Sequence, residues 1–157
     1  MKLVSDQKGT SLVEFALILP VLALILFGVL DFAKAFNYWN DETHLAAEGA
    51  RWAVVNSNPA TSGQTLQQYL QQQADTTELR SLAVVCVSFP TNSSTGTSGQ
   101  VGDPVTVTVR SRYTWLPFVS SRASLSPSTT ITGSATMRLE APPTAYSAGS
   151  GGTGTCT

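Results

Sequence analysis

Apolar residues are concentrated near the start of the chain, and polar residues dominate the rest. Residues 15–30 read FALILPVLALILFGVL, sixteen positions with neither a charge nor a hydrogen-bonding side chain. With residues 10–13 the segment of low polarity reaches about twenty residues, interrupted only by Glu14. As a helix it would be roughly 30 Å long, the thickness of the hydrocarbon core of a bilayer. The pattern therefore predicts a membrane-spanning helix.

The helical pattern continues beyond the apolar block, to about Val55. One stripe recurs at spacings of three and four residues, as on one face of a helix. It consists of Phe32, Phe36, Trp39, Thr43, Ala46, Ala50 and Ala53, with Asp41, Glu42, Glu48 and Arg51 off it. We expect one helix over residues 10–55 that packs through this stripe. It should end at residues 56–59, a cluster of turn-forming residues that closes with proline.

The remainder predicts one short helix and a small sheet. Residues 61–77 favour a helix with Thr61 and Gln64 as its capping box. Residues 81–89 are apolar and β-branched, and residues 105–109 and 131–140 alternate between apolar and polar, as in antiparallel strands with one buried face. We expect an α+β fold in which about three strands pack on the exported half of the long helix. The polar loop 91–103 and the tail 141–157 are expected to be flexible.

A cleaved secretory signal peptide is an alternative interpretation of the apolar block. The block is longer than a usual signal core, no A-x-A-like site follows it, and the helical pattern continues, so an uncleaved anchor is favoured. Lys2 and Lys8 precede the block, whereas Asp31 and Lys34 after it nearly cancel. This bias favours a single-pass protein of the cytoplasmic (inner) membrane with a cytoplasmic N-terminus and an exported C-terminal body.

Charge and composition narrow the function. Charged residues make up 12% of the chain, about half the usual share. Nine Lys and Arg against ten Asp and Glu give a net charge of -1, which does not favour nucleic acid as a partner. His44 is the single histidine, and no Cys lies near it, so no metal site is expected. The sequence shows no Ser/His/Asp set, phosphate loop or acid–base carboxylate pair, so we expect neither an enzyme nor a cofactor.

The start of the apolar block carries the most specific motif. Gly9 is followed five residues later by Glu14 and then by Phe15. The run GTSLVEFALILPVLALILFGVLDFAKAF, residues 9–36, resembles the start of TadE-like proteins (the TadE/TadG family), the pseudopilins of tight-adherence (Tad/Flp) pilus systems. Gly9, Glu14 and Phe15 match the family's motif one by one. Residues 48–55, 102–113 and 131–140 also look similar to that family.

The resemblance implies a precursor that a prepilin peptidase cuts after Gly9, so that Thr10 begins the mature chain. Residues 1–9 would be the leader, 10–31 the transmembrane half of the long helix, 32–140 an exported pilin-like domain and 141–157 the tail. The implied role is that of a minor pilin or pseudopilin in assembly, initiation or capping of a surface pilus used in adhesion. Its partners would be the prepilin peptidase, other pilin or pseudopilin subunits, an inner-membrane assembly platform and the lipid bilayer.

Glu14 has a physical role in that interpretation. A lone carboxylate at the edge of a membrane helix costs a few kcal/mol unless it is partnered. Cutting after Gly9 creates an ammonium at Thr10, which can pair with Glu14 of a neighbouring subunit and set the register of a stack. The alternative is a Glu14 that is simply solvated among headgroups. Pro20 removes one helix hydrogen bond, and we interpret it as a tolerated kink or an aid to assembly.

Two further features stay open in the sequence. Cys86 and Cys156 can form a disulfide that tethers the tail; otherwise Cys86 is a small buried apolar residue and Cys156 an unpaired thiol. Residues 115–119, WLPFV, form an apolar turn that folds under the sheet or contacts the membrane or a neighbouring subunit. Two other functions also remain open. One is a main filament subunit, and the other is a single-pass membrane protein that presents an exported binding domain.

Overall fold

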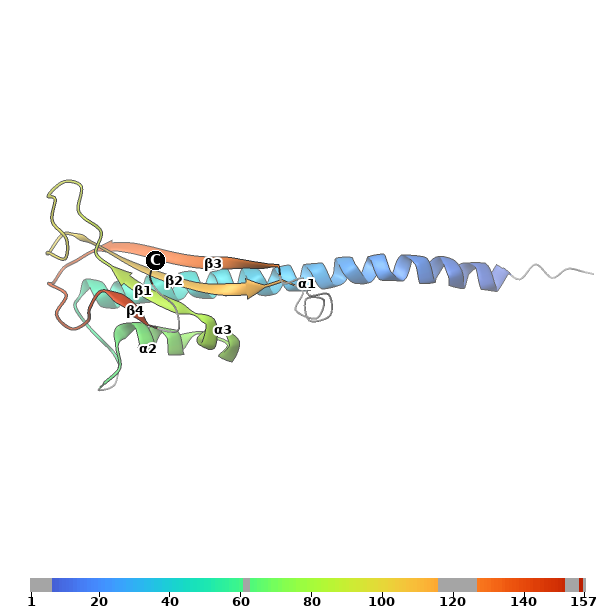
Figure 1. The fold of residues 1–157 in the computed structure, drawn as a ribbon, viewed down its shortest axis with the longest axis horizontal. Helices are drawn as coiled ribbons and strands as arrows, with labels where there is room; N and C mark the ends of the chain where they lie inside the picture. Colours follow the sequence, from blue (N-terminus) through green and yellow to red (C-terminus); the bar gives the residue numbers. More distant parts are fainter. Residues whose placement is uncertain (1–6, 61–62, 116–126, 152–155, 157) are drawn as a thin grey trace, which may run out of the picture.

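One long helix organises the whole molecule. The computed structural model describes residues 7–60, 63–115, 127–151 and 156. Helix α1 (Gln7–Val54) contains 48 residues and continues through Pro20. The sheet and the short helices cover only its C-terminal half, and the N-terminal half extends away from them (Figure 1). The long helix expected over residues 10–55 is therefore confirmed.

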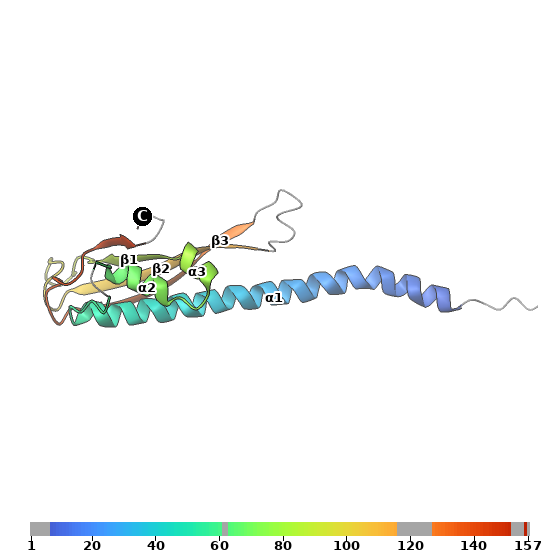
Figure 2. The ribbon, with the colours of Figure 1, turned by 90° about the horizontal axis from the view of Figure 1, so that it is seen from below.

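The sheet lies along one side of the C-terminal half of α1 (Figure 2). Its four strands are antiparallel, in the order β3-β2-β1-β4. The strands are β1 (Val84–Ser88), β2 (Pro104–Thr114), β3 (Ser128–Arg138) and β4 (Gly149–Gly151). This arrangement confirms the predicted α+β fold with the sheet on the C-terminal half of the helix, and it adds a fourth strand to the three that the sequence predicted.

The alternation of β2 places its valines in the core. Val105, Val107 and Val109 are fully buried, whereas the threonines between them are partly exposed. On the outer side, the hydroxyls of Thr106 and Thr136 on β3 lie 2.7 Å apart. Because successive side chains of a strand point to opposite faces, the period of two in the sequence determined the buried face of the sheet.

Two short helices replace the single one that the sequence predicted. Helix α2 (Leu66–Gln73) begins after Thr65, whose side chain and that of Gln68 form the capping box. Thr61 lies outside the described residues, and Gly63 has φ +95°, a left-handed conformation that does not belong to a helix. The pattern Thr-x-x-Gln occurs twice in succession, and the second copy is the cap. Helix α3 (Thr77–Leu82) then displaces the start of β1 to Val84.

The buried face of α1 differs from the predicted stripe near the membrane. Ala46, Ala50 and Ala53 are fully buried, as expected. Phe32 and Phe36, by contrast, are 65% and 57% exposed. The side chains that face the core there are Ala35, Tyr38, Asp41, Glu42 and Leu45. The prediction was wrong for this half because the sheet contacts a row shifted by about one residue from the aromatic one.

The tail returns to the end of α1. Tyr146 is buried, and its hydroxyl donates a hydrogen bond of 2.6 Å to the carbonyl of Ala53. The backbone N–H groups of Thr144 and Ala145 both donate to the side-chain oxygen of Asn56, each at 2.7 Å. Strand β4 then pairs with β1. The sequence predicted a flexible tail from residue 141, whereas the structure shows these specific contacts as far as Gly151.

Asp103 organises the loop between β1 and β2. Its carboxylate accepts hydrogen bonds from the side chains of Asn92, Thr95 and Thr97, at 2.9 to 3.3 Å, and from the backbone N–H of Gln100 at 3.0 Å. Although desolvation opposes ionisation, these donors lower the pKa of Asp103 below its usual value. The expectation of a flexible polar loop missed this network.

Candidate functional site

The N-terminal half of α1 is an apolar rod with no protein cover. Within residues 11–30 every side chain is exposed except that of Ala23, which is half-buried. The helix is long and apolar enough to cross a membrane, and its most apolar window is not buried against any other part of the described chain. Such a surface is stable only in lipid or against other apolar helices. We therefore identify this half as a membrane anchor.

The residues of the predicted processing and assembly motif lie together at the start of this anchor. The backbones of Gly9 and Thr10 belong to the first turns of α1, and Glu14 and Phe15 follow in the same helix. Thr10 and Glu14 are four residues apart, so one turn of helix separates them on the same side. Figure 2 shows α1 bending in its blue N-terminal half, the part that contains Pro20. The cutting and pairing assigned to these residues stay predictions.

A cluster of polar side chains marks where the folded domain begins on α1. The hydroxyl of Tyr113, near the end of β2, donates to the carboxylate of Asp31 at 2.6 Å and to its backbone carbonyl at 3.0 Å. Lys34 forms an ion pair of 2.7 Å with Glu78 and lies 5.5 Å from the centre of the Tyr38 ring. The cluster thus joins the turns of α1 that follow the apolar block to β2 and α3.

These contacts change how the groups ionise. The hydrogen bond to Glu78 raises the pKa of Lys34, and the same bond lowers the pKa of Glu78. Burial, and then the hydrogen bond to Asp31, raise the pKa of the Tyr113 hydroxyl. Lys34 and Glu78 are therefore charged, and Tyr113 is neutral, at physiological pH.

Glu42 is a buried carboxyl that the sequence pattern placed off the packed stripe. It is fully buried between α1 and the sheet, and Ser111 on β2 donates a hydrogen bond of 2.5 Å to its Oε1. Its Oε2 has no hydrogen-bond partner among the described residues. Burial raises its pKa from 4.5 to about 8, against the effect of the Ser111 bond. The carboxyl is therefore mostly protonated at neutral pH.

Gly133 explains why Glu42 can lie against the sheet. A Cβ on Gly133 would come within 3.0 Å of the backbone atoms of Glu42 and Thr43. Gly133 faces inward on β3, at a position where Ile131 and Ala135 are its neighbours on the same side. A glycine at an inward position of an alternating strand is typical of close backbone approach. The glycine at this inward position could have predicted from the sequence that β3 approaches another backbone closely here.

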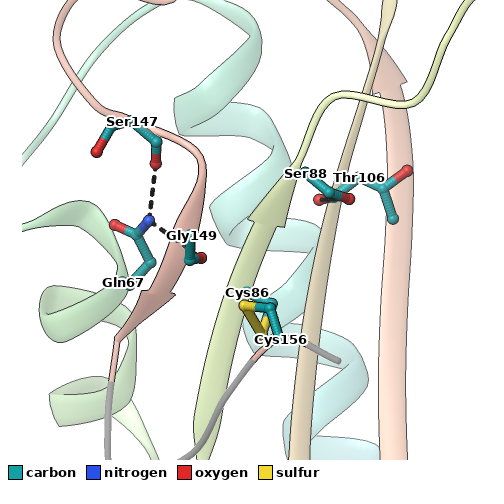
Figure 3. The surroundings of a disulfide bond; sticks show 7 residues. All are labelled: Gln67, Cys86, Ser88, Thr106, Ser147, Gly149 and Cys156. Carbon is teal, nitrogen blue, oxygen red and sulfur yellow. Dashed lines mark hydrogen bonds between the residues drawn. A yellow bond between two sulfur atoms is a disulfide. The ribbon is translucent and has the colours of Figure 1, made fainter.

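Cys86 and Cys156 form a disulfide in the structure (Figure 3), with their Cα atoms 5.6 Å apart. The bond links the end of the chain to β1. Beside it, the side-chain amide of Gln67 on α2 donates to the carbonyl of Ser147 at 2.9 Å and to that of Gly149 at 3.5 Å (Figure 3). The short edge strand β4 is thus held from β1, from α2 and through the disulfide.

The described residues offer few side chains that could hold a metal ion or catalyse a reaction. His44 is exposed on α1, and within the described ranges no group of three or more His, Cys, Asp or Glu side chains could hold a metal ion. Trp115 is the one residue of the predicted apolar turn 115–119 that the structure describes, and it is half-buried against Tyr113 with ring centres 5.0 Å apart. The other residues of that turn lie outside the described residues.

One family model matches the anchor and the part of α1 that follows it. The model of the TadE-like protein family matches residues 9–51, which begin at Gly9 and cover nearly all of α1. No curated protein and no solved structure gave a match. The apolar helix and this match together indicate a membrane-anchored protein associated with a Tad pilus. Over residues 9–51 the chain is TadE-like, which confirms the resemblance that its sequence shows.

Proposed function

We propose that this chain is a minor pilin or pseudopilin of a Tad-type surface pilus. It is inserted by α1, cut after Gly9 by a prepilin peptidase, and then acts in assembly, initiation or capping of the filament. The observation that carries the proposal is the match to TadE-like proteins, which starts at Gly9 and continues along α1. The mature anchor would then begin at Thr10.

The exposed apolar surface of residues 11–30 explains how membrane insertion and filament assembly are related. Lipid covers residues 11–30 in the membrane, and a filament must replace that lipid with the equally apolar helices of other subunits. Since lipid and helix surfaces are similarly apolar, apolar contact alone does not fix the register between subunits. Polar pairs are needed for that, and Glu14 is the one carboxylate within residues 11–30.

Pairing between subunits supplies that register. A Glu14 side chain next to the Thr10 ammonium of a neighbour is favourable mainly because either charge alone in an apolar environment is costly. Within a single subunit, Glu14 also lies one helical turn from its own Thr10.

The size of the exported part favours an accessory role. The resemblance implies that main pilins of these systems are short and lack a large β body. Here a four-stranded sheet and two short helices cover the exported half of α1. A domain of this bulk fits the end of a filament more readily than every position along it.

Two substitutions test the proposal. Gly9→Val introduces a branched side chain where the peptidase needs a narrow backbone, so the uncut precursor should accumulate. Glu14→Ala should leave cutting intact and reduce the number of pili. Gly28→Ala serves as control, because a Cβ there would meet nothing within 4 Å. Unchanged cutting and unchanged piliation in both variants would refute the proposal.

Fractionation of the cells distinguishes this role from the two alternative functions. A main subunit would be abundant in filaments sheared from the cell surface, whereas a minor subunit would be scarce there. A single-pass protein that presents a binding domain would remain in the membrane fraction and leave piliation unchanged when its gene is deleted. Immunoblots of the sheared and membrane fractions identify a main subunit, and pilus counts in the deletion strain distinguish a minor subunit from a presenting protein.

A further inference from the structure

A groove lies between α1 and the end of the sheet where β2 stops and β3 starts, which we call the hairpin end of the sheet. It is lined almost entirely by apolar side chains. Phe32, Phe36 and Trp39 form one wall, and they are 65%, 57% and 48% exposed. Trp115 at the end of β2 and Ile131 on β3 form the other. The groove has a volume of about 330 Å³. Aromatic side chains this exposed leave a large apolar area in water, so they indicate a contact surface.

The groove lies next to the membrane-spanning half of α1. If the hydrocarbon core covers residues 11–30, Phe32 and Phe36 lie roughly 3 and 9 Å beyond its edge. If the core instead begins after Glu14, about twenty residues bring its edge to Lys34, and Trp39 lies only about 8 Å beyond it. The headgroup layer is roughly 5–7 Å deep on each side. Both placements therefore bring the near end of the groove into that layer.

The chemistry of the lining fits this layer. The described lining residues include no charged side chain, and their polar members are two threonines, Thr130 and Thr132. Aromatic rings with an apolar body accumulate at the membrane–water interface, where Trp can also donate its N–H. The hairpin end of the sheet lies toward the membrane half of α1 (Figure 2). The groove therefore lies beside the membrane-spanning half of α1 and offers apolar and hydroxyl groups there.

We propose that the near end of this groove, at Phe32 and Phe36, lies in the headgroup layer and takes the glycerol-ester region of phospholipids. The exported domain then lies against the membrane surface instead of standing clear of it. A second copy of the chain is the competing occupant. Lipid is favoured because the groove continues along the same helix as a rod that lipid must already cover. The inference depends on membrane anchoring alone, so cutting and pilus assembly can fail without affecting it.

The three tryptophans of the chain provide the test. Trp39 and Trp115 line the groove, whereas Trp52 lies thirteen residues further along α1, roughly 20 Å from Trp39 and away from the membrane. Variants that keep one tryptophan and replace the other two by phenylalanine isolate each signal. The full chain is reconstituted in phosphatidylcholine/phosphatidylglycerol vesicles that contain phospholipid brominated near the glycerol end of its acyl chains. Circular dichroism checks that each variant is folded.

We expect brominated lipid to quench the fluorescence of Trp115 most, because Trp115 follows Tyr113 on β2 and Tyr113 contacts Asp31 at the edge of the membrane-spanning half. Trp39, roughly 8 to 14 Å beyond the edge of the core, should be quenched less, and Trp52 least. The quenching should be the same at low and high ratios of protein to lipid. Quenching of Trp115 that is no stronger than the quenching of Trp52 would overturn the proposal. So would protection of Trp39 from aqueous acrylamide that arises only at a high ratio of protein to lipid, because this result would assign the groove to a second copy.

Discussion

The hydroxyl of Ser111 on β2 donates a hydrogen bond of 2.5 Å to the carboxyl of Glu42 on α1, and both residues are buried. The bond joins the sheet to the helix inside the folded domain. Its acceptor is a carboxyl whose pKa burial raises to about 8. The stability of the domain should therefore depend on pH through this residue.

Replacing Glu42 by glutamine should remove that dependence. Folded Glu42 keeps its proton up to about pH 8, whereas the unfolded chain releases it above about pH 4.5. The folded state thus binds more protons between these values, and the free energy of unfolding falls as pH rises through this window. The loss should be on the order of 2 kcal/mol after allowance for solvent screening. In Glu42→Gln this loss should be absent, and only the contribution of Asp41, whose pKa burial also raises, should remain.

Urea unfolding of the full chain in detergent micelles, followed by circular dichroism at several pH values, measures this effect. Glu140→Gln is the matched control, because Glu140 is exposed and its replacement should retain the wild-type dependence. An equal slope for wild type and Glu42→Gln would show that Glu42 is not the titrating group.

Gly133→Ala should loosen the sheet from α1. The added Cβ would lie within 3.0 Å of backbone atoms of Glu42 and Thr43, which cannot move aside as a flexible side chain can. Overpacking of this kind costs about 1–3 kcal/mol. The measurement is the urea midpoint, with the outward-facing neighbour Ser134→Ala as control. If both variants unfold at the same midpoint, the close contact is absent.

Breaking the link between Cys86 and Cys156 should release the end of the chain. The bond closes a loop with a sequence separation of 70, for which the chain-entropy model gives about 4 kcal/mol. Reduction should therefore lower the free energy of unfolding and make the tail sensitive to protease. The double variant Cys86→Ser/Cys156→Ser should show the same loss and no further response to reductant.

The mass of the intact protein checks the bond itself. Reduction should raise the mass by two hydrogens in the wild type and by none in the double variant. A wild-type mass that reductant leaves unchanged would mean that the two cysteines are not bonded.

Tyr146→Phe should weaken the docking of the tail on α1. The variant loses the hydrogen bond to the carbonyl of Ala53 but keeps the ring, and it leaves a buried carbonyl without that donor. The expected cost is about 1–2 kcal/mol. Limited proteolysis should cut between residues 140 and 151 faster than in the wild type. Ser147→Ala serves as control, because Ser147 is exposed and the variant keeps the backbone carbonyl that Gln67 contacts. Equal rates in both variants would argue against a docked tail.

Periodicity was sufficient to predict the long helix and the buried face of β2. A run of sixteen apolar residues and a period of two do not depend on which partner covers them. The prediction of a packed stripe was wrong at Phe32 and Phe36, because the face of a helix that packs does depend on the partner. Near the membrane α1 has two apolar faces, one for the sheet and one for another partner, and a periodicity does not say which face belongs to which.

Strand β4 and the position of Glu42 were beyond the reach of sequence patterns. Gly149, Ser150 and Gly151 have low strand propensity, and they form a strand because β1 offers a free edge and Gln67 holds the backbone beside it. Glu42 is buried because Ser111 and Gly133, far away in sequence, provide a donor and a gap. Only the inward glycine carried a local signal of this.

The N-terminal sequence of the protein purified from membranes tests the central claim most directly. If the chain is a processed pseudopilin, its mature form begins at Thr10 and reads TSLVEF, with Glu14 at the fifth position. A mature chain that begins at Met1, or one that begins after Leu30, would contradict the account.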